Sequence, residues 1–147
     1  MQKPAPLIDR RDIYEVEERI GHDGDIVTAL DEASVDRVIG QIAEGAYQAV
    51  AVVLLHAYVN PAHEQRIEAK IAAALPDIHI STSADVSPKY REYERTNTTV
   101  ANCYVKPVVS NYVRRLQSAL NEKQFKRDLF IMQSSGGLVS PDFARDY

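Results

Sequence analysis

The sequence predicts an α/β fold in which helices cover a mixed or parallel sheet. Apolar residues recur at helical spacing within residues 31–45 and again within 60–76. Between these stretches lies AVAVVLL at 49–55, a uniformly apolar run that is typical of a strand covered on both faces. IHIST at 78–82 follows the second helical stretch, so strand, helix and strand form a βαβ unit.

The amino-terminal part is expected to hold an extended arm and a hairpin. Residues 1–12 form the arm, which carries prolines. Apolar-dotted runs at 13–20 and 25–29 flank Asp23 and Gly24, which tolerate the positive φ of a tight turn. We therefore predict that these two runs are strands joined by that turn.

Local signals predict where both helices begin and end. Asp31 is expected to cap the first helix by accepting hydrogen bonds from its unpaired backbone N–H groups, and Gly45 suits its exit. Asn60 is a favourable N-cap for the second helix, Pro61 its first residue, and Pro76 its end. The buried stripes are expected to consist of Val35, Val38, Ile39 and Ile42 in the first helix and Ile67, Ile71 and Leu75 in the second.

The carboxyl-terminal half begins with an unusually polar stretch, SPKYREYERTNTTVANCYVKPV, at residues 87–108. A long helix is expected here, with a kink or a restart at Pro107. DLFIMQ at 128–133 is predicted to be another buried strand, followed by a turn. Ser140 is expected to cap a last helix whose first residue is Pro141.

Composition excludes several classes of partner. A net charge of −4 over 147 residues gives no basic field that would favour nucleic acid or an acidic membrane. No run reaches the ~18 apolar residues of a membrane span, and no signal peptide is recognisable, which predicts a cytoplasmic location. Cys103 is the single cysteine, so an intrachain disulfide is excluded, and its apolar helical face favours a core role over a nucleophilic one.

A first candidate site is MQSSGG at 132–137, at the carboxyl end of a predicted strand. Ligands of open parallel sheets bind beyond such ends, and glycine N–H groups there can hold an anion. Gln133, Ser134 and Ser135 would add side-chain hydrogen bonds. The alternative is a tight connection in which Gly136 and Gly137 supply positive φ.

A second candidate is a metal site formed by His56, His63 and Glu64. Two imidazoles and a carboxylate are suitable ligands for zinc or another divalent cation. The alternative is that each histidine caps the following helix or faces solvent, because the loop between them does not fix their geometry.

The third candidate is the polar stretch itself. Glu92 and Glu94 lie near a helix start, where carboxylates interact well with the helix dipole. The run Thr96 to Thr99 has poor helix propensity and costs roughly 1–2 kcal/mol against alanine. Capping, buried hydrogen bonds or a ligand must offset that cost; the alternative to a ligand is a salt-bridged helix start packed against a neighbouring segment.

Three segments together resemble a known family. LLHAYVNPAHEQRI, SADVSPKYREYERTNTTVANCYVKPVVSNYVRRL and FIMQSSGGLVS, in this order and spacing, look like consecutive parts of hydantoinase/oxoprolinase A-type subunits. That family includes N-methylhydantoinase A, ATP-dependent 5-oxoprolinases and ketone carboxylase subunits. The resemblance covers residues 10–147 and implies a fragment of an actin/Hsp70/sugar-kinase-like two-lobed protein. It further implies that the parent uses ATP and Mg, hydrolyses a cyclic amide such as hydantoin or 5-oxoproline, and works with a B-type subunit or domain.

The resemblance also implies domain limits and roles. Residues 1–88 would end the amino-terminal domain and 89–147 would begin the truncated A domain, with the junction within 83–97. Arg95, Asn97 and Thr98, with Glu92, would hold the two parts in register or line the substrate side. Gln133, Ser134, Ser135, Gly136 and Gly137 would lie near the cleft, and Glu92 and Glu94 are the candidate general bases.

Departures from the family pattern predict an inactive fragment. The phosphate loop of the type Asp-x-Gly-Gly-Thr and the later Ser-Gly-Pro segment are missing, and Ser135 stands where the family usually has Asn. No cofactor is therefore expected for the fragment, and a homo-oligomer could cover its cut surfaces. The competing interpretations are a non-catalytic α/β module that docks a partner subunit, and a metal-dependent hydrolase.

Overall fold

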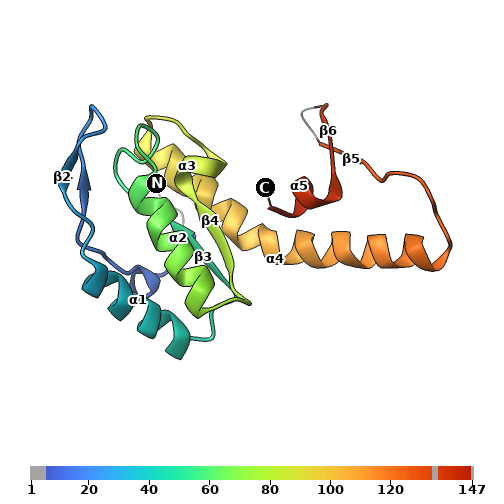
Figure 1. Ribbon diagram of the computed structural model, residues 1–147, viewed down its shortest axis with the longest axis horizontal. Helices are drawn as coiled ribbons and strands as arrows, with labels where there is room; N and C mark the ends of the chain where they lie inside the picture. The colour runs from blue at the N-terminus through green and yellow to red at the C-terminus, as the bar shows by residue number, and fades with distance from the viewer. Residues whose placement is uncertain (1–5, 134–135, 147) are drawn as a thin grey trace, which may run out of the picture. The chain divides into compact units, whose positions relative to one another are not determined.

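The computed structural model describes residues 6–133 and 136–146 of the chain, which divides into two compact units. The first unit extends to Cys103 and the second begins at Tyr104. The first unit contains an antiparallel strand pair, a parallel strand pair and helices, so the predicted α/β class is confirmed (Figure 1).

The predicted amino-terminal hairpin is present but has a shorter ladder. After a 3-10 turn, η1 (Arg10–Asp12), strands β1 (Arg19–Ile20) and β2 (Ile26–Thr28) pair antiparallel, and Gly24 in the turn has φ +92. Residues 13–18 alternate in exposure as a strand does, yet they lie outside the ladder. Glu17 explains the difference, because its backbone pairs with Asp31 N and Ser34 Oγ rather than with a strand.

Helices α1 (Glu32–Glu44) and α2 (Ala62–Ala74) begin where their caps predict, within one residue. Asp31 accepts hydrogen bonds from Ala33 N and Ser34 N at 3.3 and 2.9 Å. Asn60 Oδ1 accepts from Ala62 N at 3.1 Å, so Asn60 caps α2, but the helix starts one residue after Pro61.

Removal of the Asp31 cap should have a measurable cost. We expect Asp31→Ala to lower the free energy of unfolding by about 1 kcal/mol, because two N–H groups of α1 lose their acceptor. Urea denaturation followed by circular dichroism measures this loss. Asp31→Asn keeps a capping oxygen and should stay close to the wild type; an equal loss in both variants would contradict the capping role.

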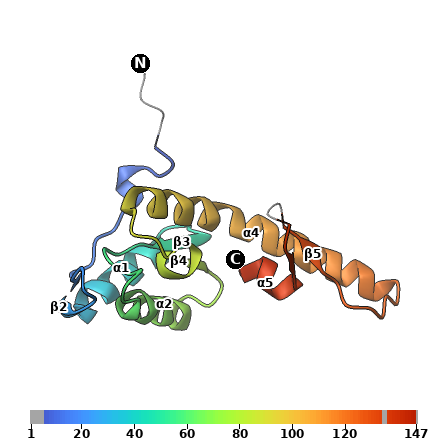
Figure 2. The ribbon, with the colours of Figure 1, turned by 90° about the horizontal axis from the view of Figure 1, so that it is seen from above.

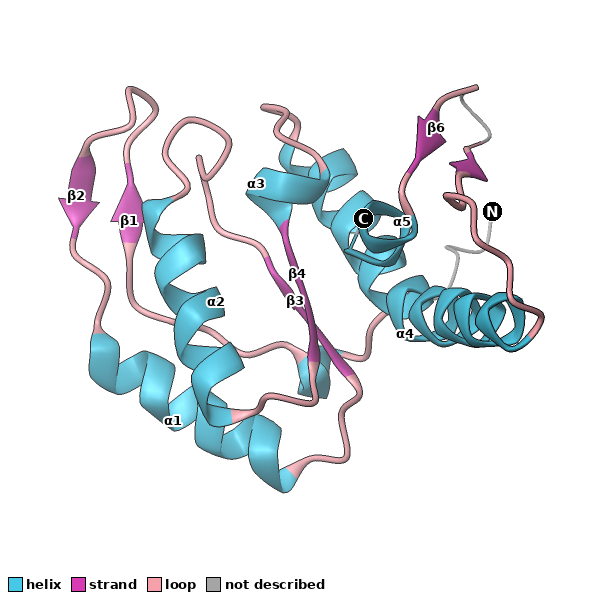
Figure 3. Ribbon diagram, turned by 45° about the vertical axis from the view of Figure 1, so that its right-hand side comes forward, coloured by secondary structure: helices cyan, strands magenta, loops and turns pink. Residues whose placement is uncertain are grey.

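The parallel pair lies at the centre of the first unit. Strands β3 (Ala49–Val52) and β4 (His79–Thr82) pair in register from Ala49↔His79 to Val52↔Thr82, which confirms the βαβ unit. Figure 2 shows the pair between α2 and the first half of α4, and Figure 3 shows α2 along the strands. The core consists of Val35, Val52, Ile67 and Ile71. Strand β3 is shorter than predicted and only Val52 in it is buried, because a two-stranded sheet leaves its edges partly open.

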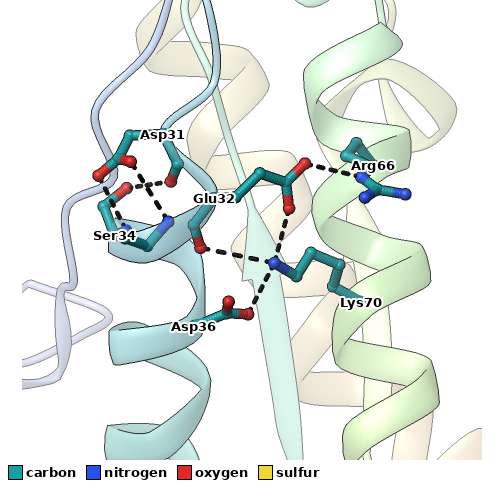
Figure 4. Close-up of polar contacts among 7 residues, drawn as sticks. Asp31, Glu32, Ser34, Asp36, Arg66 and Lys70 are labelled. Carbon is teal, nitrogen blue, oxygen red and sulfur yellow. Dashed lines mark hydrogen bonds and ion pairs between the residues drawn. The ribbon is translucent and has the colours of Figure 1, made fainter.

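An ion-pair network joins α1 to α2 (Figure 4). Glu32 accepts hydrogen bonds from Arg66 Nε at 2.9 Å and from Lys70 Nζ at 2.6 Å, and Lys70 also pairs with Asp36 at 2.6 Å. The hydrogen bonds from Lys70 and then Arg66 lower the pKa of Glu32, and those to Asp36 and then Glu32 raise the pKa of Lys70. The network fixes the two helices side by side over the core.

Helix α4 (Glu92–Glu122) follows a four-residue helix, α3 (Ser83–Val86), that the sequence did not predict. Helix α4 is continuous through Pro107, so the predicted restart does not occur; proline removes one backbone donor, and the remaining bonds carry the helix on. Among the described residues, no helix combines the length and the apolar character needed to cross a membrane.

The second unit holds a small hairpin in place of the predicted buried strand. Strands β5 (Ile131–Met132) and β6 (Leu138–Val139) pair antiparallel, and α5 (Pro141–Asp146) follows. The burial predicted for 128–133 is wrong: Phe130 and Met132 are 58% and 73% exposed, because no layer of this unit covers them. The last helix starts as predicted, with Phe143 N donating to Ser140 Oγ at 3.2 Å.

Candidate functional site

The carboxyl ends of β3 and β4 lie side by side, because the strands are parallel and Val52 pairs with Thr82. Beyond such ends, open α/β sheets bind their ligands. The polar groups of the residues that follow the two strands turn toward one side chain, Glu64 from the first turn of α2.

Glu64 is fully buried and accepts three hydrogen bonds. Its Oε1 accepts from Leu54 N at 2.7 Å and from Ser83 Oγ at 2.6 Å, and its Oε2 accepts from Ala84 N at 2.9 Å. One carboxylate thus connects the segment after β3, the start of α2 and the start of α3. The sequence analysis missed Leu54 and Ser83, and it considered Glu64 only as a candidate metal ligand.

Burial raises the pKa of the Glu64 carboxyl above 4.5. Hydrogen bonds from Ser83, Ala84 and Leu54, and the positive charge of Arg95, offset part of this rise. The folded chain therefore binds a proton at Glu64 more readily than the unfolded chain does.

This shift predicts a specific pH dependence of stability. A raised folded pKa gives stability that is fully present below about pH 4.5 and is lost as pH rises through the folded value. We therefore expect the free energy of unfolding of the wild type, measured relative to Glu64→Gln, to fall between pH 4 and pH 7. Urea titrations of both proteins across this range test the sign, and a difference that rises with pH would contradict it.

Arg95 lies in the protein interior, whereas the family resemblance implied that it would hold two parts of the parent in register or line the substrate side. Its side chain is 1% exposed; Nη2 donates to Leu54 O at 2.7 Å and Nη1 to Lys89 O at 3.1 Å. The guanidinium carbon lies 5.5 Å from the centre of the Tyr58 ring. Within the described residues its Nε has no hydrogen-bond partner. Arg95 thus attaches the first turn of α4 to the end of β3.

The threonines at the start of α4 satisfy their hydroxyl groups within the helix. Thr96, Thr98 and Thr99 each donate to the backbone oxygen four residues earlier, at 2.7 to 2.8 Å. This arrangement needs no ligand and agrees with the packed-helix alternative for Thr99, which is buried. Thr98 is exposed, so its position also suits contact with a substrate.

The two candidate bases face solvent. Glu92 and Glu94 are exposed in the first turn of α4, and Glu94 pairs with Arg91 at 3.4 Å. Asn97 is half-buried on the same helix. Glu94 and Thr98, at positions i and i+4, share one exposed face of α4, and Arg95 points to the interior. Glu92 is exposed two residues before Glu94, and the helical spacing directs it to another side of the helix.

The three metal candidates have separate partners. His56 Nδ1 donates to Ile20 O at 2.9 Å from a backbone with φ 59, and His63 Nδ1 donates to Glu18 Oε2 at 2.7 Å. Glu64 is held by the donors described above. Within residues 6–133 and 136–146, no group of three histidine, cysteine or acidic side chains is placed to hold a metal ion.

In the 132–137 candidate site, the described residues Gln133, Gly136 and Gly137 hydrogen-bond to one another. Gln133 N donates to Gly137 O at 2.8 Å and Gly136 N donates to Gln133 O at 2.9 Å, so these two N–H groups are not directed at an anion. Gly136 has φ +91, as predicted, whereas Gly137 lies outside the left-handed region. Ser134 and Ser135 lie outside the described residues.

Comparisons with known proteins identify relatives of the whole chain. A family model described as the hydantoinase/oxoprolinase N-terminal region matches residues 2–75, and one described as hydantoinase/oxoprolinase matches 95–147. An uncharacterized protein of Methanocaldococcus jannaschii is 42% identical over 99% of this chain and 21% of its own length. The alpha subunit of caprolactamase from Pseudomonas jessenii is 40% identical over 82% of this chain and 17% of its own.

Two solved structures share the fold of the chain. The crystal structure of ATP-dependent caprolactamase from Pseudomonas jessenii matches with a TM-score of 0.87 and 36% identity, over 95% of this chain and 20% of that one. A nucleotide-free structure of acetone carboxylase, from work on ATP-dependent acetone carboxylation, matches with a TM-score of 0.84 and 26% identity, over 99% and 21%. The chain spans about a fifth of the length of these relatives.

Proposed function

Since this chain belongs to the hydantoinase/oxoprolinase family, we propose that it is a segment of an ATP-dependent subunit that opens a cyclic amide ring, such as that of hydantoin or 5-oxoproline. The observation that carries this proposal is the match to the crystal structure of ATP-dependent caprolactamase from Pseudomonas jessenii. That likeness extends over nearly the whole chain at a TM-score of 0.87.

ATP and Mg belong to the parent protein in this proposal. The chemistry that ATP supplies is a phosphoryl group that activates the amide or carboxylate for attack by water. The nucleotide site is proposed to be incomplete in this chain. An Asp-x-Gly-Gly-Thr loop is absent from the given sequence, and the N–H groups of Gln133 and Gly136 donate to backbone oxygens of Gly137 and Gln133. The segment alone is therefore proposed to be inactive.

The domain change is proposed to fall within residues 83–97, with 1–88 in the first domain and 89–147 in the second. The matched ranges of the two family models end at 75 and begin at 95, which supports this interval. Arg95 lies at its end and holds α4 to the segment after β3, as a residue that keeps the two parts in register would.

The exposed part of the α4 start is proposed to face the substrate side of the cleft. Glu92 and Glu94 are accessible carboxylates that could accept a proton from an attacking water, with Asn97 and Thr98 as hydrogen-bonding groups beside them. Gln133, Gly136 and Gly137, with Ser134 and Ser135, are proposed to lie near a cleft of the parent protein.

The partner is proposed to be a B-type subunit or domain, and the location cytoplasmic. The caprolactamase relative is named as an alpha subunit, which supports assembly with another subunit. A second candidate function, a non-catalytic module that docks a partner, is favoured by one observation. Large apolar side chains of the second unit are exposed, including Tyr104 at 83% and Val108 at 69%.

The deciding experiment assays the full-length subunit with its partner. Hydantoin, 5-oxoproline and small ketones are each incubated with and without ATP, and ring opening or carboxylation is followed by chromatography. We expect ATP-dependent ring opening of at least one cyclic amide. Partner binding without turnover of any substrate would favour the docking module. Carboxylation of a ketone without ring opening of any cyclic amide would indicate that the parent is a ketone carboxylase subunit.

Thr98→Ala separates a catalytic role of the α4 start from a structural one. Alanine has the higher helix propensity and Thr98 is exposed, so the free energy of unfolding should stay the same or rise by a few tenths of a kcal/mol. Turnover of the full-length subunit should fall about tenfold if the hydroxyl meets the substrate or its activated form. Thr96→Ala, which removes the same type of internal bond, is the control; equal turnover in both variants would remove the substrate role of Thr98.

A further inference from the structure

Three hydrogen-bond donors at the carboxyl edge of β3 and β4 form a binding site for one carboxylate. Leu54 N–H comes from the segment after β3, and Ser83 O–H and Ala84 N–H come from the segment after β4. In open parallel sheets this is where an external ligand lies. In this chain the carboxylate of Glu64 occupies this binding site, and Glu64 is fully buried.

Side chains from two helices bind the backbone of Leu54. Leu54 donates its N–H to Glu64 on α2 and accepts at its C=O from Arg95 Nη2 on α4, at 2.7 Å in both cases. The backbone of Leu54 therefore links the carboxylate to the first turn of α4. A displacement of the carboxylate would move Leu54 and, with it, the acceptor that anchors Arg95.

We propose that Glu64 is a positioning residue whose carboxylate acts as an internal anion, closing the carboxyl edge of β3 and β4 and fixing the first turns of α4. The substrate or nucleotide of the parent then binds away from this edge. The effect on turnover rests on the proposed function, in which the exposed residues Glu94 and Thr98 of those turns face the substrate. The internal anion itself depends only on the contacts of the first unit.

Acetate rescue tests the internal anion directly. Glu64→Ala removes the side-chain atoms beyond Cβ, and acetate has the same heavy atoms as the missing group. We expect the variant to be less stable than the wild type and to regain stability saturably in sodium acetate at pH 7. Acetate at twenty times its Kd should raise the folded-to-unfolded ratio of the variant about 20-fold.

Three controls isolate the effect. The wild type and Glu44→Ala, which alters an exposed glutamate at the end of α1, should respond to acetate no more than to sodium chloride of equal ionic strength. Acetamide offers one acceptor oxygen where acetate offers two, so at least one of the three donors stays without an acceptor, and acetamide should rescue Glu64→Ala more weakly than acetate. Equal responses of Glu64→Ala and the wild type to acetate would overturn the proposal.

Glu64→Gln keeps the test decisive if Glu64→Ala does not fold. The amide protons of Leu54 and Ala84 lose a charged acceptor in this variant, so their NMR signals should move upfield and their exchange should accelerate at least tenfold. The amide of Ala62, which donates to Asn60, is the internal control and should not change. Unchanged signals for Leu54 and Ala84 would contradict the internal anion.

The full-length subunit separates the positioning role from the proposed function. Glu64→Ala should lower kcat at least tenfold, leave KM within twofold and recover kcat in acetate. If acetate rescues stability while kcat is unaffected by the substitution, the role in turnover is wrong and the internal anion stands. If the wild-type subunit opens no ring with ATP, the proposed function fails, and acetate rescue of the 147-residue chain still decides the structural claim.

Discussion

Arg95→Ala is expected to lower the free energy of unfolding by about 3–5 kcal/mol, because two buried backbone acceptors lose their donor. The guanidinium donates to Leu54 O and Lys89 O, and both acceptors would lose their partner in a buried setting. The substitution would also leave a cavity beside the Tyr58 ring and remove a positive charge that lowers the pKa of Glu64.

Two variants make this expectation specific. Arg95→Lys keeps the charge but cannot reach both carbonyl groups with a planar fork, so it should recover only part of the loss. Arg91→Ala removes an exposed arginine four residues earlier and should leave the urea midpoint unchanged. A stability of Arg95→Ala within about 1 kcal/mol of the wild type would show that the interior contacts contribute little.

His63→Ala is expected to cost about 3 kcal/mol, because it leaves the Glu18 carboxylate buried without its partner. The two side chains are 8% and 6% exposed and join α2 to the strand-like segment before β1 at 2.7 Å. Thermal and urea denaturation both measure the loss. His63→Gln retains a donor and should lose less.

His22→Ala is the matched control for this pair, since His22 is exposed in the hairpin turn and should leave stability unchanged. A loss of less than 1 kcal/mol in His63→Ala would indicate that Glu18 reaches solvent or another donor when His63 is absent. Such a result would reopen the question of what His63 does, including the metal alternative that its present partner does not favour.

Local signals in the sequence were sufficient for the N-terminal caps of α1, α2 and α5 and for the positive φ of two glycines. Asp31, Asn60 and Ser140 act on N–H groups two or three residues away, so short stretches of sequence contain the whole interaction. Gly24 and Gly136 adopt positive φ for the same local reason. The α/β class followed from the βαβ pattern, which needs only the order and period of the apolar residues.

Burial depends on neighbours that a local pattern does not describe. DLFIMQ has the composition of a buried strand, but Phe130 and Met132 are exposed because this unit supplies no covering layer. The burial of Glu64 was missed because a charged residue is expected to be exposed. Glu64 lies on the buried stripe of α2 with Ile67 and Ile71, and its spacing alone would have indicated a buried carboxylate.

The same spacing argument applies to Arg95 in α4. It shares a helical face with Thr99 and Cys103, both of which are buried, so its inward direction could have been predicted from positions i, i+4 and i+8. The partners of Arg95 could not, because Leu54 lies 41 residues away in the sequence. The exposed candidates Glu92, Glu94 and Thr98 were correctly placed near a helix start, and their roles in catalysis stay predictions.

The parallel register of β3 and β4 has a consequence for how the chain folds. Ala49 meets His79 only after the intervening helix α2 has brought the chain back, whereas Ile131 meets Val139 across a tight turn. Closing the longer loop costs conformational entropy before the contacts between β3 and β4 can form. Within an intact chain, the β5–β6 hairpin should therefore form faster than the β3–β4 pair. During synthesis, the first unit therefore gains its parallel pair only when residues up to Thr82 have left the ribosome.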